Sequence, residues 1–245
     1  MFALSSSVYD VAVVTRRERI RNDTIETIKD AALDQIAREG ASALSIRGIA
    51  RAIGMSPAGL YRYYDGLDAL ITDLVTDAYT DLADVVETAV ARKGTMIDRF
   101  KAGVSAYREW AITHPNRFLL IFGTPIPGYA APEGGPTVDA NRRMGEALFM
   151  VAAEGWARDE IRVPPIGREV TASERELANM IASRVPRFPP ELIPVLLGTW
   201  AHFHGLVTLE VLEQLHWMYP DPEQFVLGEV DRMLKGLTAG GERET

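Results

Sequence analysis

Apolar residues recur along most of the chain with the three-to-four-residue spacing of amphipathic helices. The first such stripe consists of Ile25, Ile28, Ala32 and Ile36, and Gly40 marks its end. Further helices are predicted at 46–53, from Pro57 onward, and at 68–92, 96–113, 115–122, 137–160, 172–184, 190–216 and 221–237. Loops rich in proline and glycine are expected at 124–136 and 163–167. No run shows the alternation of a strand, so the predicted fold is all-α.

The segment from Ile46 to Asp65 has the spacing of a helix-turn-helix. Ala50 is small enough for two helices to cross closely, and Gly54 permits the positive φ of a tight turn. A small core would come from Ile49, Ile53, Met55 and Leu60. The second helix of such a motif enters the major groove of DNA. The alternative interpretation is an ordinary corner between two helices.

The same segment resembles the DNA-binding head of the tetracycline-repressor (TetR) family. The resemblance rests on the runs Ser45–Ala50, Ile53–Ser56 and Leu60–Tyr64, which follow one amphipathic helix. Family members often carry a Lys just before the next helix, whereas this chain has Asp65-Gly66-Leu67-Asp68. Side-chain chemistry and position in the motif together predict a DNA-binding set of Ser45, Arg47, Ser56, Pro57, Ala58, Gly59, Tyr61, Arg62 and Tyr63.

The charge distribution supports a nucleic-acid contact by this head. The 245 residues carry a net charge of −8, which by itself argues against nucleic-acid binding. Residues 15–64, however, hold nine basic and six acidic side chains, a net charge of +3. The cluster Arg16, Arg17, Arg19 and Arg21 could reach a phosphate or the minor groove, or could be a solvated helix start. The sequence leaves both open.

The region 95–240 is similar to the regulatory domain of TetR proteins with a WHG-type C-terminal domain. The similarity rests on Trp200, His204 and Gly205 and on the run His114–Phe118. It implies an apolar cavity for a small-molecule effector of unknown identity. Candidates to line it are Tyr107, Trp110, Phe118, Phe122, Phe149, Trp156 and Trp200, with His204 as a polar handle. Each could instead simply pack the core.

The last two predicted helices suggest a homodimer. Apolar residues occupy nearly every face between Leu192 and Leu215, so this helix should be covered on all sides. The predicted dimerisation residues are Leu206, Leu209, Leu212, Val226, Val230, Met233 and Leu237. A single buried core helix is the alternative.

Motifs for catalysis are missing from the sequence. There is no cysteine, no nucleophile elbow, no phosphate loop and no His-Glu-x-x-His zinc motif. The acidic run Asp73, Asp77, Asp81 and Asp84 is interpreted as a solvated helix face rather than a metal site. We therefore expect no catalytic residues, no metal and no cofactor. No run approaches about 18 consecutive apolar residues, so we expect neither a membrane span nor a membrane partner. We expect the protein to be cytoplasmic.

These observations predict a flexible arm (1–14), a helix-turn-helix domain (15–66), a connecting helix (67–94), a ligand-binding and dimerisation domain (95–240) and a tail (241–245). The predicted function is a ligand-responsive repressor that binds an inverted-repeat operator as a homodimer and is released by a small apolar molecule. An activator or non-specific DNA binder would share the same head. An all-α enzyme with a structural helix-turn-helix is the remaining alternative.

Overall fold

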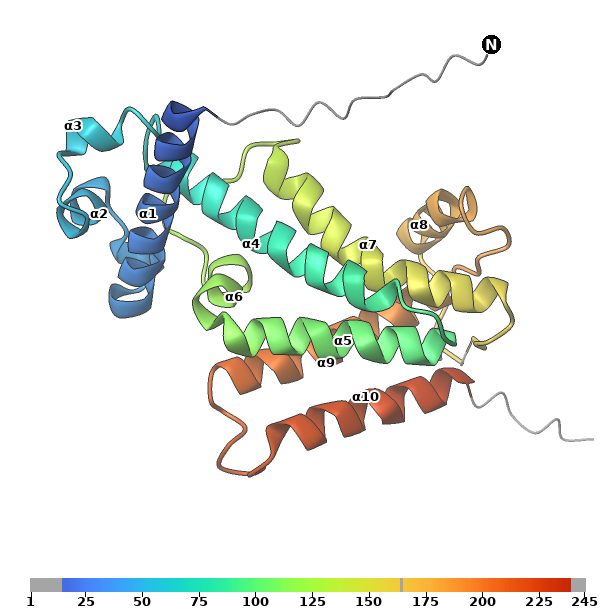
Figure 1. Ribbon diagram of the computed structural model, residues 1–245. Helices are drawn as coiled ribbons and strands as arrows, with labels where there is room; N and C mark the ends of the chain where they lie inside the picture. Colours follow the sequence, from blue (N-terminus) through green and yellow to red (C-terminus); the bar gives the residue numbers. More distant parts are fainter. Residues whose placement is uncertain (1–14, 164, 239–245) are drawn as a thin grey trace, which may run out of the picture. The chain divides into compact units, whose positions relative to one another are not determined.

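A computed structural model describes residues 15–163 and 165–238 (Figure 1). Within these ranges it contains helices and no strand, which confirms the all-α prediction. The predicted arm (1–14), Pro164 of the second predicted loop and the predicted tail (241–245) lie outside the described residues. The chain forms two compact units, one up to Ile71 and one from Thr72.

The first unit is built from α1 (Arg16–Glu39), the 3₁₀ turn η1 (Ala41–Ala43), α2 (Ile46–Ala52) and α3 (Pro57–Leu60). Helix α1 begins well before the apolar stripe that predicted it. Its start is fixed by a capping box, in which the Glu18 N–H donates to the Thr15 hydroxyl and the Thr15 N–H donates to the Glu18 carboxylate. Gly40 ends the helix with a φ of 82°, as the sequence predicts.

The second unit consists of most of α4 and six further helices. Helix α4 (Leu67–Val90) contains the boundary between the units and lies in the range predicted for the connecting helix. The others are α5 (Met96–Thr113), α6 (Pro115–Phe122), α7 (Pro136–Ala157), α8 (Ala172–Ala182), α9 (Leu192–Val211) and α10 (Pro222–Thr238). Helix α5 packs against α6, α7, α9 and α10 and forms the centre of this unit (Figure 1).

Two helices end earlier than the hydrophobic pattern predicts. Helix α7 stops at Ala157, shortly before Asp159, whose φ is 61°. Helix α9 stops at Val211, shortly before Glu213, whose φ is 57°. A left-handed backbone at a non-glycine residue cannot continue a right-handed helix. Apolar residues beyond these points, such as Ile161 and Leu215, are buried from loops instead.

Candidate nucleic-acid interface and effector cavity

The helix-turn-helix forms as its residue types predict. Gly54 has a φ of 67°, and the Met55 N–H donates to the Ala50 carbonyl at 2.8 Å, which closes the turn. Ala50, Ile49 and Leu60 are completely buried. A larger side chain in place of Ala50 would therefore push the two helices apart.

One buried polar side chain joins α1 to the start of α2, and the sequence analysis did not single it out. Gln35 donates from Nε2 to the Ala43 carbonyl at 3.1 Å and accepts from the Ser45 N–H at 3.4 Å. A Cβ on Gly48 would lie 2.7 Å from the same amide. A glutamine within an otherwise apolar helix stripe was the available signal. This contact positions the N-terminus of α2.

Most of the predicted DNA-binding residues lie on the surface of this unit. The exposed ones are Arg47, Ser56, Pro57, Ala58, Tyr61 and Arg62, while Ser45 and Tyr63 are partly buried. The hydroxyls of Ser45 and Ser56 each accept a backbone N–H as helix caps, from Gly48 and Gly59. Each hydroxyl hydrogen is still available to donate to a phosphate oxygen.

Gly59 corrects the predicted set. It is buried, and a Cβ there would lie 2.9 Å from the Met55 side chain. Gly59 therefore faces the interior and allows α3 to pack closely, so it does not present itself to a base.

Arg21 of the basic cluster is exposed and makes a contact that the sequence analysis did not predict. Its guanidinium lies over the Tyr63 ring, 5.3 Å from the centroid, and donates to the Arg62 carbonyl at 3.5 Å. This contact holds one cation of α1 beside Arg62 and Tyr63, which follow α3. Arg16, Arg17 and Arg19 are exposed on the first turns of α1.

The second unit contains a partly open apolar cavity of about 260 Å³ among α5, α6, α7, α9 and α10. Three of the eight predicted pocket residues line it, namely Phe122, Phe149 and Trp200. Asn141 of α7 adds an amide to walls that are otherwise largely apolar. The volume of the cavity lies just below the range of about 300–1,000 Å³ that is common for small-molecule sites.

The other predicted pocket residues do not line this cavity. Tyr107, Trp110 and Phe118 are buried and form the core behind the wall. Trp156 lies elsewhere and donates from Nε1 to the Arg187 carbonyl at 2.9 Å. His204 stacks on Trp200 but does not reach the cavity. Size and aromatic character alone could not separate wall from core.

His204 is held by the buried Tyr107. The Tyr107 hydroxyl and His204 Nδ1 lie 2.9 Å apart. Burial lowers the pKa of His204 and raises the pKa of Tyr107. The imidazole is therefore neutral at pH 7. His204 was predicted to be a polar handle for a ligand, but its imidazole instead hydrogen-bonds the buried hydroxyl of Tyr107.

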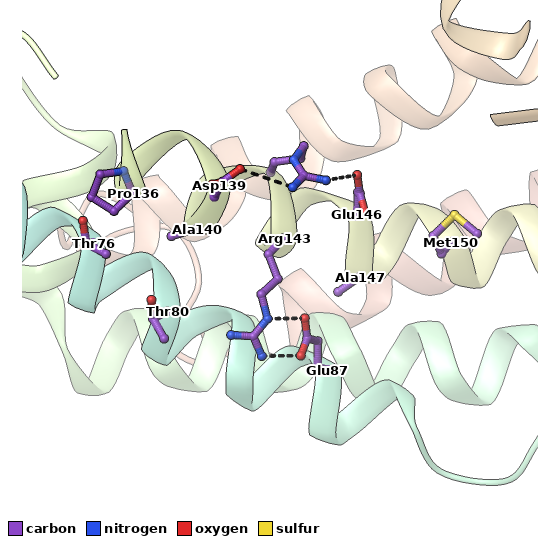
Figure 2. Close-up of a pocket in the computed structure, with 11 residues that line it drawn as sticks. Thr76, Thr80, Glu87, Pro136, Asp139, Ala140, Arg143, Glu146, Ala147 and Met150 are labelled. Atoms are coloured by element: carbon purple, nitrogen blue, oxygen red, sulfur yellow. Dashed lines mark hydrogen bonds and ion pairs between the residues drawn. The ribbon is translucent and has the colours of Figure 1, made fainter. Parts of the chain in front are cut away.

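Two carboxylates of the acidic run on α4 pair with arginines of neighbouring helices while remaining substantially exposed, so this face carries ion pairs as well as solvent contact. Asp81 pairs with Arg117 of α6. Arg143 of α7 donates to Asp84 at 2.6 Å. It also pairs with Glu87 through two contacts, which Figure 2 shows. The Arg143–Glu87 pair lines an open groove of about 570 Å³ between α4 and α7. The carboxylates thus join α4 to the rest of its unit.

A buried ion pair, also missed by the sequence analysis, joins α5 to α9. Arg108 donates to Glu210 from Nε at 2.8 Å and from Nη2 at 2.5 Å, and its Nη1 lies 3.1 Å from Glu223 of α10. Both members of the Arg108–Glu210 pair are less than 10% exposed. A charged residue at helical spacing within an apolar run was the available signal.

The predicted dimerisation stripe of α10 needs correction. Val226, Val230 and Leu237 are buried within the chain itself, and Met233 lines the cavity. The predicted dimerisation residues on α9 and just after it are more accessible, because Leu209 and Leu212 are exposed and Leu206 is half-buried. A stripe of apolar residues marks a packed face but does not say whether the packing is within one chain or between two.

The exposed face of α9 is built largely from small and apolar residues. It consists of the exposed residues Leu197, Gly198, Ala201, His202, Leu209 and, just past the helix end, Leu212, together with the half-buried Gly205. By length and composition α9 could cross a membrane, contrary to the expectation from uninterrupted apolar runs, and 28% of its most apolar window is buried. A core helix of a soluble protein has the same composition. The observation shows that α9 carries more apolar surface than its own unit covers.

Comparison with known families matches both units. Residues 28–74 match the model of the bacterial regulatory proteins of the TetR family. Residues 100–233 match the tetracycline-repressor-like C-terminal domain. HTH-type transcriptional regulators of Mycobacterium bovis and Mycobacterium tuberculosis are each 34% identical to the chain over 208 residues. The match covers 82% of this chain and 86% of each relative.

Solved structures agree with these matches. The crystal structure of the regulatory protein SCO4313 is 35% identical and superposes with a TM-score of 0.69, covering 90% of this chain and 99% of that one. A TetR family transcription regulator from Marinobacter aquaeolei is 16% identical and shares the fold, with a TM-score of 0.60 over 89% of this chain and 98% of that one. The chain therefore belongs to the TetR family of DNA-binding transcriptional regulators.

Proposed function

We propose that this regulator is a ligand-responsive repressor, which binds an inverted-repeat operator as a homodimer and is released by a small apolar molecule. The observation that carries the proposal is the pairing, in one chain, of an exposed helix-turn-helix surface with a separate helical unit that contains an apolar cavity. The first feature supports DNA reading and the second supports effector binding.

The head supports sequence reading with few phosphate contacts. Arg47 is exposed at the start of α2, where it can donate two hydrogen bonds to a guanine or bind a phosphate. Tyr61 and Arg62 follow α3 and are exposed beside Pro57 and Ala58. Because the head has a net charge of only +3 and no Lys at 65–68, non-specific binding should be weak. Tight binding then requires base contacts and two heads.

The face of α9 supports the homodimer. Gly198, Ala201 and Gly205 let another helix approach closely, and a Cβ on either glycine would meet nothing within 4 Å. Leu209 and Leu212 extend the same face with larger apolar side chains. A second copy of this chain would cover that surface. Two joined heads also bind two half-sites with a raised effective concentration.

The cavity supports a small apolar effector. Binding can weaken operator affinity only by the difference between the effector's affinities for the DNA-bound and released states, typically about 1–3 kcal/mol. The α4 ion pairs with Arg117 and Arg143 link the helix that leads from the head to the helices around the cavity. They are contacts through which a change in the cavity could reach α4.

A gel shift on the intergenic DNA beside the protein's own gene tests DNA binding. We expect retardation that persists with non-specific competitor. Arg47→Ala should cost about 1–3 kcal/mol and relax specificity at one base position. Arg232→Ala, which removes an exposed arginine of α10, is the control and should bind like the wild type. Absence of retardation at low salt would reject the proposal.

Analytical ultracentrifugation tests the dimer. The wild type should sediment as a dimer, and Ala201→Arg, which places a charge at the centre of the exposed α9 face, should sediment as a monomer. Ala157→Arg adds the same charge at an exposed position on the last turn of α7 and should remain dimeric. Equal behaviour of the two variants would exclude α9 from the interface.

A further inference from the structure

A second hollow lies beside the effector cavity, between α7, α8 and the start of α9. Its volume is about 560 Å³, and it shares Gly145, Phe149 and Leu197 with the cavity. The two spaces therefore adjoin at these residues. The inner space is apolar, whereas the outer one carries charged side chains at its rim.

Gly145 leaves room where the two spaces meet. It lies in the middle of α7, and a Cβ there would meet nothing within 4 Å. A glycine in a helix interior costs stability relative to alanine, so this position is not explained by helix formation. It is also not explained by a close approach of another helix. Gly145 is exposed, and its lack of a side chain leaves the surface open where the two hollows adjoin.

The outer hollow has two arginines at its rim that share one carboxylate. Arg142 Nη1 donates to Glu146 Oε1 at 3.2 Å, and Arg184 Nη1 donates to Glu146 Oε2 at 3.2 Å. Arg142 also donates to Asp139, at 3.3 Å, on the preceding turn of α7. All of these pairs are solvent-exposed, so each is weak. The rim of this hollow therefore holds two guanidinium groups whose carboxylate partners, Glu146 and Asp139, form weak, exposed pairs that a ligand anion can replace.

We propose that the effector is an anionic amphiphile, whose apolar chain occupies the inner cavity and whose head group is bound by Arg142 and Arg184. This proposal rests on the proposed function, since it names the chemical class of the effector. Burial of the ligand's apolar chain in the cavity supplies the non-directional part of the binding affinity. The planar guanidinium groups bind a carboxylate or phosphate through paired hydrogen bonds, and a ligand anion would take the place of Glu146 between them.

Isothermal titration calorimetry on the full chain, without DNA, tests the class directly. The probes are decanoate, decanol and decyltrimethylammonium below their aggregation concentrations, because they share one chain and differ in head-group charge. We expect decanoate to bind at least tenfold more tightly than decanol, and the cation to bind most weakly. Arg142→Gln combined with Arg184→Gln should abolish the preference for decanoate and leave decanol binding unchanged.

Two further variants separate this site from a purely structural ion-pair cluster. Glu146→Gln should tighten decanoate binding severalfold, because it frees both guanidinium groups, whereas a structural cluster would be weakened. Gly145→Leu should reduce binding of decanoate and decanol alike by filling the open space where the two hollows adjoin. Arg162→Gln changes an exposed arginine paired with Asp159, away from both hollows, and should alter neither.

Equal affinities for decanoate and decanol would overturn the proposal, as would a preference that survives in the double arginine variant or a loss of decanoate binding in Glu146→Gln. The gel shift makes the two failures distinguishable. If the protein retards DNA but binds no decanoate, the effector class is wrong and the regulator stands. If it binds decanoate through Arg142 and Arg184 but retards no DNA, the site stands and the repressor does not.

Discussion

Two glycines of α7 should respond in opposite ways to the same substitution. Gly145 faces open space, so Gly145→Ala adds a methyl group that meets no atom within 4 Å. An alanine in a helix interior is about 1 kcal/mol more favourable than a glycine. We expect Gly145→Ala to stabilise the protein by about that amount.

Gly155 lies ten residues later on the same helix, where α7 crosses the start of α5. A Cβ there would lie 2.5 Å from Met96 Cγ and 2.8 Å from Met96 Cβ. The second atom cannot move without the backbone of α5. Overpacking of this kind costs about 1–3 kcal/mol. Because the helix-propensity gain is similar in both variants, Gly155→Ala should be less stable than Gly145→Ala by about 1–3 kcal/mol.

Chemical unfolding followed by far-UV circular dichroism measures this difference. The variants must be compared at one protomer concentration, because dimerisation would add to the apparent stability. The expected gap corresponds to roughly 2–12 °C in Tm for a domain of this size. Equal stabilisation by both alanines would refute the close crossing of α7 and α5. Destabilisation by Gly145→Ala would refute the open space beside the cavity.

Three further predictions concern the pH response, the turn and the buried ion pair. Burial lowers the pKa of His204 below its usual 6.5, so the unfolded state binds the proton first and stability should fall as the pH drops through 6.5. In thermal unfolding, the Tm of His204→Gln should fall by less than the Tm of the wild type when the pH is lowered from about 7.5 to 5.5. An equal fall in Tm would contradict a lowered pKa for His204. Ala50→Leu should abolish operator retardation by separating the helices, whereas Ala52→Leu, on the exposed side of α2, should preserve it. Glu210→Gln leaves the Arg108 charge buried and should cost about 3–5 kcal/mol in urea unfolding, and a cost below about 1 kcal/mol would show that the pair is solvated.

The head was predictable in detail because its constraints are local. Gly54 must adopt a positive φ and Ala50 must be small wherever this turn occurs, so residue type and spacing suffice. Gly59 shows the limit of that reasoning. A glycine in a recognition segment suits close approach either to DNA or to Met55, and the choice depends on which way one turn of helix faces.

The second unit was predictable in its helices but not in their partners. Phe122 and Phe118 lie on the same short helix, yet one lines the cavity and the other is buried behind it. Val226 and Leu209 both lie on apolar stripes, yet one faces inward and the other outward. These assignments depend on contacts between residues far apart in the sequence, which periodicity does not encode.

The central claim is that this chain reads a defined operator as a repressor. A DNase footprint on the DNA upstream of its own gene tests it most directly. The account predicts protection of a short inverted repeat that overlaps a promoter, with half-sites about one helical turn apart or a multiple of it. Uniform protection without a repeat, or no protection where the protein is in excess, would contradict the account.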